Sequence, residues 1–115
     1  MKVFAQRAID MARSAGATYA DARLVEAREQ FISTRNGEVE SLVDADSVGM
    51  GIRVIFSGAW GFAACPEVTN EAIERTTRLA VAVAKASALV KAGEVKLAPE
   101  ECVVDTWHSP CEKDP

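Results

Sequence analysis

The chain has 115 residues, of which 49% are hydrophobic and 26% are charged. This composition predicts one ordered domain that can bury a core without a metal or a disulfide. The formal net charge of -4 and the scattered basic residues argue against a nucleic-acid surface, and no apolar stretch is long enough to span a bilayer or to act as an export signal. Three cysteines, an odd number, predict free thiols and a cytoplasmic protein.

The first segment has the spacing of an amphipathic helix. Apolar residues recur every three to four positions from Phe4 to Ala15, and Gly16 stands where a helix end needs a residue that tolerates positive φ. Residues 20–25 then alternate between polar and apolar, as in a half-buried strand. The alternation slips near residues 26–29, where we expect a bulge or a bend.

Residues 31–43 form a predicted hairpin around Asn36-Gly37, because both central residues of a type I′ turn need positive φ. With these two residues as the loop, the predicted cross-strand pairs are Arg35/Glu38, Thr34/Val39, Ile32/Ser41 and Phe31/Leu42.

A second predicted hairpin turns at Ser57-Gly58. Its predicted pairs are Ile55/Trp60, Arg53/Phe62 and Gly51/Ala64. Gly49 and Gly51, which have no side chain, then share a face with Trp60 and Phe62, whose rings can lie over them. The candidate residues for a peptide-binding site or an interface are therefore Gly49, Gly51, Arg53, Trp60 and Phe62. They fit either a stacking platform for a ligand or a packing cluster with a cation–π contact, and we favour packing.

After Pro66, Thr69 or Asn70 can cap a long Ala-rich helix, which Gly93 ends. Its predicted inner stripe is Ile73, Thr76, Leu79, Ala80, Val83, Ser87 and Val90. The sequence thus predicts an α+β domain over residues 1–93, in which an antiparallel sheet of two hairpins or a meander packs against two helices. Residues 94–115, with a short β-like run at 102–107, are expected to be an extended connector.

No complete catalytic motif occurs in the chain. A thermolysin-like zinc site needs two histidines on one helix face, whereas His108 is the only histidine here. Cys102, His108 and Cys111, with Cys65 joining in space, could form a zinc site, but the tight C-x-x-C spacing is absent. We favour buried or surface roles for these residues, and we expect no catalytic role for His108 because neighbours on an extended tail seldom meet correctly.

Four segments in order, residues 14–23, 32–40, 49–54 and 58–63, resemble the first domain of the TldD/PmbA family. Residues 107–115 resemble the segment that leads into the middle domain of that family, which favours the TldD-like branch. Since the HExxxH metal motif of the family lies beyond the point where this chain stops, no catalytic residue is carried over to it, and the length suggests a fragment, a domain or a truncated product.

The resemblance implies cytoplasmic proteins, some of them zinc metalloproteases that trim peptides or process unfolded chains as homo- or heterodimers. The link of these proteins to DNA gyrase is indirect, which agrees with the lack of a basic surface. We expect an accessory domain that shapes the peptide channel and the dimer, with the remaining domains and unfolded peptide as partners. The alternatives are a free-standing peptide- or protein-binding adaptor without peptidase activity, or a small zinc protein. The strand at residues 49–54 is the candidate edge for binding an extended peptide by strand addition.

Overall fold

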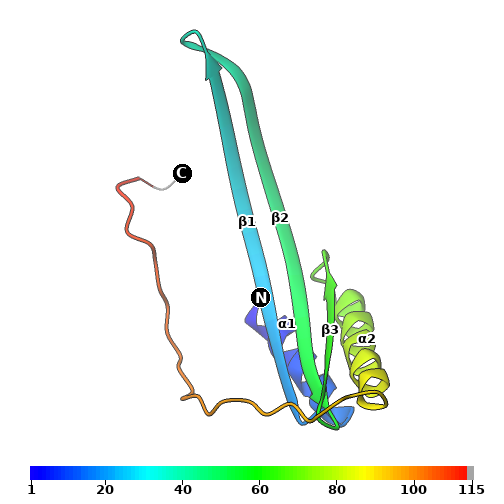
Figure 1. Cartoon of the computed structure of the whole chain (residues 1–115). Helices are drawn as coiled ribbons and strands as arrows, with labels where there is room; N and C mark the ends of the chain where they lie inside the picture. Colours follow the sequence, from blue (N-terminus) through cyan, green and yellow to red (C-terminus); the bar gives the residue numbers. More distant parts are fainter. Residues whose placement is uncertain (114–115) are drawn as a thin grey trace.

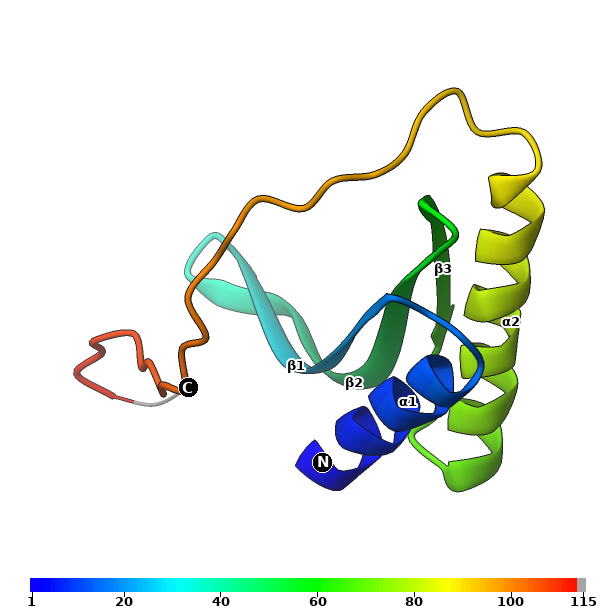
Figure 2. The same cartoon turned by 90° about the horizontal axis from the view of Figure 1, so that it is seen from below.

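Three consecutive strands form an antiparallel meander in the computed structural model, which describes residues 1–113. The strands are β1 (Tyr19–Arg35), β2 (Glu38–Phe56) and β3 (Ala59–Cys65), and β2 lies in the centre (Figure 1). The helices α1 (Lys2–Ser14) and α2 (Asn70–Ala88) pack together on one side of the sheet (Figure 2). The predicted α+β class is confirmed, and the two hairpins prove to share one strand.

Both turns have the predicted geometry. Asn36 and Gly37 have φ values of 52° and 79°, and Ser57 and Gly58 have values of 47° and 75°. All three predicted pairs of the second hairpin are confirmed, and so are the two pairs nearest the first turn.

The rest of the predicted register of the first hairpin is wrong. The pairing shifts between Ser33 and Thr34, which leaves Glu40 as an extra residue in β2. Ile32 therefore faces Leu42 in place of Ser41, and Phe31 faces Val43 in place of Leu42. The irregularity expected at residues 26–29 does not exist, because both faces of the hairpin meet water there and polar residues on either face need no bulge.

The core lies between the inner face of the sheet and the two helices. Met50, Ile52 and Val54 of β2 point inward and are at most 2% exposed. Gly61 of β3 lies so close to α2 that a Cβ atom built on it would be 2.6 Å from the backbone nitrogen of Ala84. The bare glycine therefore lets the helix backbone approach the strand directly.

This close approach corrects the predicted inner stripe of α2. The buried residues are Ala72, Ile73, Thr76, Thr77, Ala80, Val81 and Ala84. Because the backbone of Ala80 and both the backbone and the small side chain of Ala84 lie against Gly61, the predicted stripe residues Leu79 and Val83 turn toward solvent. Val90 lies beyond the helix and is also exposed.

The start of α2 decides between the two predicted caps, and its end differs from the one predicted at Gly93. Thr69 is the N-cap, since its hydroxyl accepts a hydrogen bond of 3.2 Å from the backbone N–H of Ala72. The helix ends at Ala88 with Leu89 as its C-cap, so Gly93 does not terminate it.

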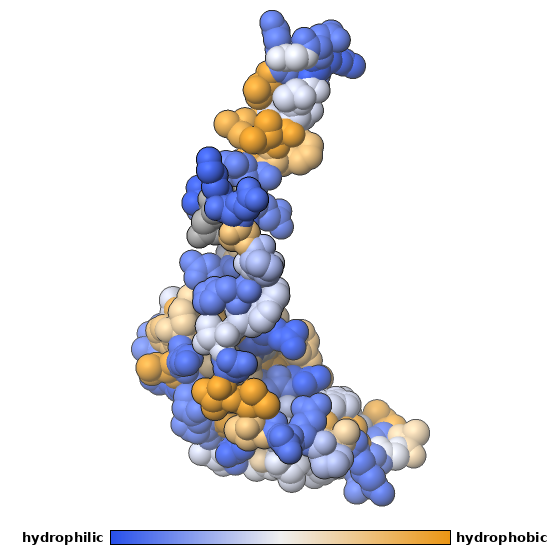
Figure 3. Space-filling view, turned by 90° about the vertical axis from the view of Figure 1, so that its left-hand side faces the viewer, coloured by the Kyte–Doolittle hydropathy of each residue, from blue (hydrophilic) through white to orange (hydrophobic). Residues whose placement is uncertain are grey.

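Beyond β3, strands β1 and β2 continue as a two-stranded arm, which we define as residues 26–47 (Figure 1). The arm accounts for the long dimension of a molecule that measures 60 × 30 × 28 Å. Five apolar residues near its tip are at least half exposed: Phe31, Ile32, Val39, Leu42 and Val43. Figure 3 shows this apolar band just below the polar tip.

Residues 89–113 contain no helix or strand, and Figure 2 shows this tail on the side of the sheet opposite the helices. The backbone N–H of Val95 donates to Gly58 O at 2.9 Å, and Lys91 donates to Ser57 O, so the tail is attached to the second turn. The β-like run at 102–107 pairs with no strand, and the domain boundary at residue 93 stays a prediction.

Candidate functional site on the outer face of the sheet

The strand alternation brings the five predicted site residues to one face of the sheet. Because successive side chains in a strand point to opposite faces, Gly49, Gly51 and Arg53 face away from the helices while their neighbours fill the core. Trp60 and Phe62 of β3 lie on the same outer face, directly opposite Ile55 and Arg53.

A groove of about 380 Å³ opens on this face. Its floor includes the bare backbone of Gly49 and Gly51, and the Phe62 ring forms a wall. A Cβ atom on Gly51 would be 3.1 Å from that ring, so the aromatic side chain lies over the glycine as predicted. Phe62 is still 60% exposed, which leaves most of the ring available for contact.

Charged side chains border the groove. Arg53 Nη2 lies 2.6 Å from Asp21 Oδ2, and its guanidinium carbon is 4.9 Å from the centre of the Trp60 ring. The Tyr19 hydroxyl donates to Asp21 at 2.8 Å, and its ring meets Trp60 edge to face at 6.1 Å. The predicted cation–π contact therefore exists, and it belongs to a connected group of four side chains.

This group changes the acidity of two of its members. The pKa of the Tyr19 hydroxyl is raised, first by its hydrogen bond to the Asp21 carboxylate, then by burial, and then by repulsion between the phenolate and the Asp21 charge. The hydrogen bond to Asp21 likewise raises the pKa of Arg53. Arg53 is thus held as a cation between a carboxylate and an aromatic ring.

Tyr19 and Asp21 are residues of this face that no sequence pattern indicated. Their place on the outer face depends on the β1–β2 register, which the shift at Ser33/Thr34 changes by one residue. A one-residue shift moves every side chain of a strand to the opposite face.

The expected strand addition along residues 49–54 is contradicted by the sheet topology. β2 is the central strand, and its residues from Met50 onward pair with β1 on one side and β3 on the other. No backbone group is free there to accept a further strand. A ligand of this region would contact the outer face and not a strand edge.

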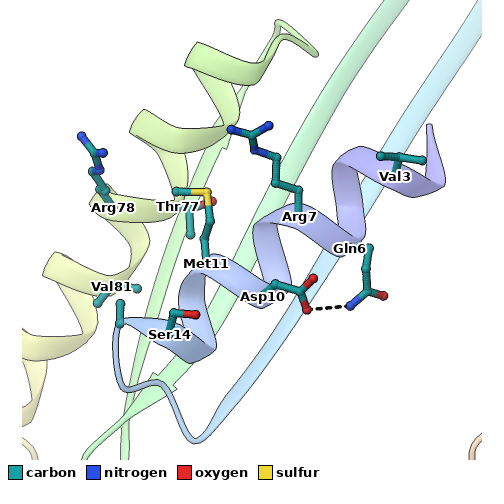
Figure 4. Close-up of a pocket in the computed structure, with 10 residues that line it drawn as sticks. Val3, Gln6, Arg7, Asp10, Met11, Ser14, Thr77, Arg78 and Val81 are labelled. Atoms are coloured by element: carbon teal, nitrogen blue, oxygen red, sulfur yellow. Dashed lines mark hydrogen bonds between the residues drawn. The ribbon is translucent and has the colours of Figure 1, made fainter.

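A second groove, of about 770 Å³, lies between α1 and α2 (Figure 4). Val3, Met11 and Val81 supply apolar lining, and Arg7 reaches across to Glu74 at 2.5 Å. No sequence pattern indicates this groove, because its walls come from helices that are distant along the chain.

The metal-ligand types named from the sequence do not gather in the described structure. Cys65 is buried, and its thiol donates to the carbonyl of Glu67, whereas Cys102 and Cys111 are exposed on the tail. Within residues 1–113 no group of three or more His, Cys, Asp and Glu side chains is placed to hold a metal ion. In the same part of the chain, no helix is long and apolar enough to cross a membrane.

Comparisons with known proteins agree with this architecture. The family described as PmbA/TldA metallopeptidase domain 1 matches residues 20–84, which include β1 from its second residue, all of β2 and β3, and most of α2. A curated relative is the metalloprotease MJ0996 of Methanocaldococcus jannaschii, which is 27% identical over 89 residues. The alignment covers 77% of this chain and 20% of the relative, so the chain spans about a fifth of that protein.

The match defines an α+β domain of metallopeptidase type. The chain belongs to the PmbA/TldD family and carries its first domain.

Proposed function

We propose that this chain is the N-terminal accessory domain of a cytoplasmic zinc metallopeptidase, in which it guides an unfolded peptide and helps to build the dimer. The observation that carries the proposal is the outer-face groove, with bare backbone at Gly49 and Gly51 and the exposed ring of Phe62 beside it. Three free cysteines support the cytoplasmic location.

The groove suits an extended chain with apolar side chains. Glycines allow a ligand backbone to come close, and an exposed aromatic ring offers apolar contact without demanding one particular residue. Arg23 and Arg53 at the border can donate hydrogen bonds to peptide carbonyl or carboxylate groups. Because β2 has no free edge here, such a chain would lie across the face and be held through side-chain contacts.

Hydrolysis and zinc binding belong, in this proposal, to the part of the full-length protein outside the chain. The described residues lack a cluster of metal ligands, and the single histidine stands on the exposed tail. This chain would therefore affect how substrate is captured and oriented, with no residue in direct contact with the metal.

Peptide binding can be tested by titrating reduced and carboxymethylated α-lactalbumin, a permanently unfolded chain, into the isotope-labelled protein. We expect backbone amide shifts at Gly49, Gly51 and Phe62, and weaker binding by Phe62→Ala. Leu79→Ala is the matched control, since Leu79 is similarly exposed but lies on α2. Shifts confined to other surfaces, or equal loss in both variants, would contradict the proposal.

The same groove could serve a free-standing adaptor, so a second experiment separates the two functions. In the full-length protein, Phe62→Ala should raise KM for cleavage of the unfolded chain while kcat changes little, because the ring contacts only the distant part of the substrate. A full-length protein that binds the unfolded chain but does not cleave it would favour the adaptor.

A further inference from the structure

The outer-face groove is closed at one end and open at the other. The Asp21–Arg53 ion pair stands across the closed end, where both side chains line the groove and Trp60 packs against Arg53 from behind. Toward the arm, the next opposed pair on this face is Ala27 and Ser47, whose small side chains leave the groove open. Between the two ends, the opposed pairs are Arg23/Gly51 and Val25/Gly49.

The length of the groove suits the end of a chain. Its lining residues on β1 run from Asp21 to Val25, which is about 13 Å along a strand and room for about four residues of an extended ligand. A chain that continued past the closed end would have to rise over Arg53 and the Trp60 ring. A chain that enters from the arm and stops at the ion pair fits without this detour.

The charge of the groove selects which end of a chain fits. Arg53 is neutralised by Asp21, whereas Arg23 has no carboxylate within ion-pair distance among residues 1–113. Arg23 therefore leaves the lining with one positive charge in excess. An excess positive charge attracts a terminal carboxylate and repels the ammonium group of an N-terminus.

We propose that the outer-face groove binds the C-terminal end of an unfolded peptide, with Arg23 donating hydrogen bonds to the terminal carboxylate. This inference rests on the proposed function and names the part of the substrate that the groove recognises. An arginine can present two parallel N–H groups to one carboxylate, and such charged hydrogen bonds are stronger than those to a neutral carbonyl. Arg53 stays with Asp21, so the Asp21 carboxylate does not oppose the incoming charge.

The side chain of the last peptide residue would contact apolar atoms beside Arg23. The Phe62 ring leans over Gly51, which is the cross-strand partner of Arg23, and the ring is 60% exposed. Val25 is half exposed and lines the groove from β1. A leucine at the C-terminus would bury apolar surface against both side chains, whereas a glycine would lose this contact.

Binding through the C-terminus would fix the direction of the peptide, whose remaining residues leave toward the arm. Hydrolysis of a peptide bond, which the proposed function assigns to the rest of the full-length protein, gives one product with a new terminal carboxylate. This product is again a ligand for the groove. The domain would therefore hold a chain between successive cuts.

Two peptides that differ only at the C-terminus test the proposal on the isotope-labelled 115-residue chain. One is N-acetyl-Ala-Ser-Ala-Ala-Leu with a free carboxylate, and the other is the same peptide with a C-terminal amide. We expect both to shift the backbone amides of Gly49 and Gly51, and the free acid to bind about three to ten times more tightly. This difference should shrink at high salt, because salt screens exposed charges. Equal affinities would overturn the proposal.

A third peptide distinguishes a terminal carboxylate from one within the chain. N-acetyl-Ala-Ala-Glu-Ala-Leu amide has the same net charge as the free acid, but it carries that charge on a side chain. It should bind no better than the neutral amide, because its glutamate would lie toward the open end of the groove and away from Arg23. Binding as tight as that of the free acid would reject recognition of the terminus.

Arg23→Gln tests the assigned donor. The affinity for the free acid should fall to about that for the amide, while the affinity for the amide changes little. Arg75→Gln is the matched control, since it removes the same charge from an exposed position on α2, across the sheet from the groove. Equal effects of the two variants, or a preference for the acid that survives Arg23→Gln, would refute the role of Arg23.

Failure of this inference can be told apart from failure of the proposed function. Phe62→Ala should weaken the acid and the amide by the same factor, because its apolar contact does not depend on charge. If the two peptides bind equally and Phe62→Ala weakens both, the groove function stands and the recognition of the terminus falls. If neither the peptides nor the unfolded protein shift Gly49 and Gly51, both fall.

Discussion

Asp21 and Arg53 face each other across β1 and β2, and the Arg53 guanidinium donates to the Asp21 carboxylate while it lies against Trp60. The same carboxylate accepts from the Tyr19 hydroxyl. The Asp21 side chain therefore connects Tyr19 with Arg53 and, through Arg53, with Trp60, on the face that carries the groove.

Asp21→Asn should lower the pKa of Tyr19 toward its ordinary value of about 10, because the carboxylate that disfavours the phenolate is gone. Tyr19 is the only tyrosine in the chain, so an ultraviolet absorbance titration reports on it alone. Asp44→Asn removes a similar exposed ion pair with Arg28 and should leave the titration unchanged.

The hydrogen bond between Tyr19 and Asp21 also predicts that the stability of the protein depends on pH. Since folding raises the pKa of Tyr19, its contribution to the free energy of unfolding is present below about pH 10 and is lost as the pH rises through the folded-state pKa. Asp21→Asn should reduce this alkaline loss. Urea denaturation on either side of that pH measures it, and an identical loss in both proteins would speak against the assigned cause.

Gly61→Ala should destabilise the fold by about 1 to 3 kcal/mol or more, because the added methyl group would collide with the backbone of α2. Gly49→Ala is the control, since its Cβ would meet only Cys65 O at an ordinary distance of 3.5 Å. Urea denaturation compares the two, and a similar cost for both would show that α2 can move away.

Thr69→Ala should cost about 0.5 to 2 kcal/mol of stability through loss of the helix cap, whereas Asn70→Ala should cost less. Asn70 accepts only an exposed hydrogen bond from Arg7. Thermal denaturation of the two variants distinguishes the positions, and the reverse order would place the cap at Asn70.

Ser57→Asn should stabilise the second turn by a few tenths of a kcal/mol, because Asn tolerates the left-handed conformation better than Ser. Asn36→Ser makes the opposite change at an equivalent position of the first turn and should destabilise the arm. Chemical denaturation would report the first change, and hydrogen exchange in the arm would report the second.

Local signals in the sequence predicted the elements that depend on neighbouring residues. Gly16 ends α1, Thr69 caps α2, and both two-residue turns have their positive φ angles. The bulge at Glu40 gave no such signal, because both faces of the arm are exposed there and no apolar alternation marks the extra residue.

The bulge at Glu40 also explains why Tyr19 and Asp21 were not predicted to lie at the site. Continued without it, the register from Asn36-Gly37 would place Ala20 opposite Arg53, so Asp21 and Tyr19 would point into the core. The inner face of α2 was mispredicted for a different reason. Periodicity favours the larger Leu79 and Val83, whereas the approach to Gly61 selects the smallest side chains, and that contact is visible only in three dimensions.

β2 runs without interruption from the exposed arm into the centre of the core, and its two halves have different surroundings. Residues 38–47 bond to one neighbour and meet water on both faces, whereas Met50, Ile52 and Val54 are enclosed. Amide protons of the first group should exchange by local fraying, and those of the second only through global unfolding. A single strand thus contains a gradient of local stability, along which the arm can open repeatedly while the core stays folded.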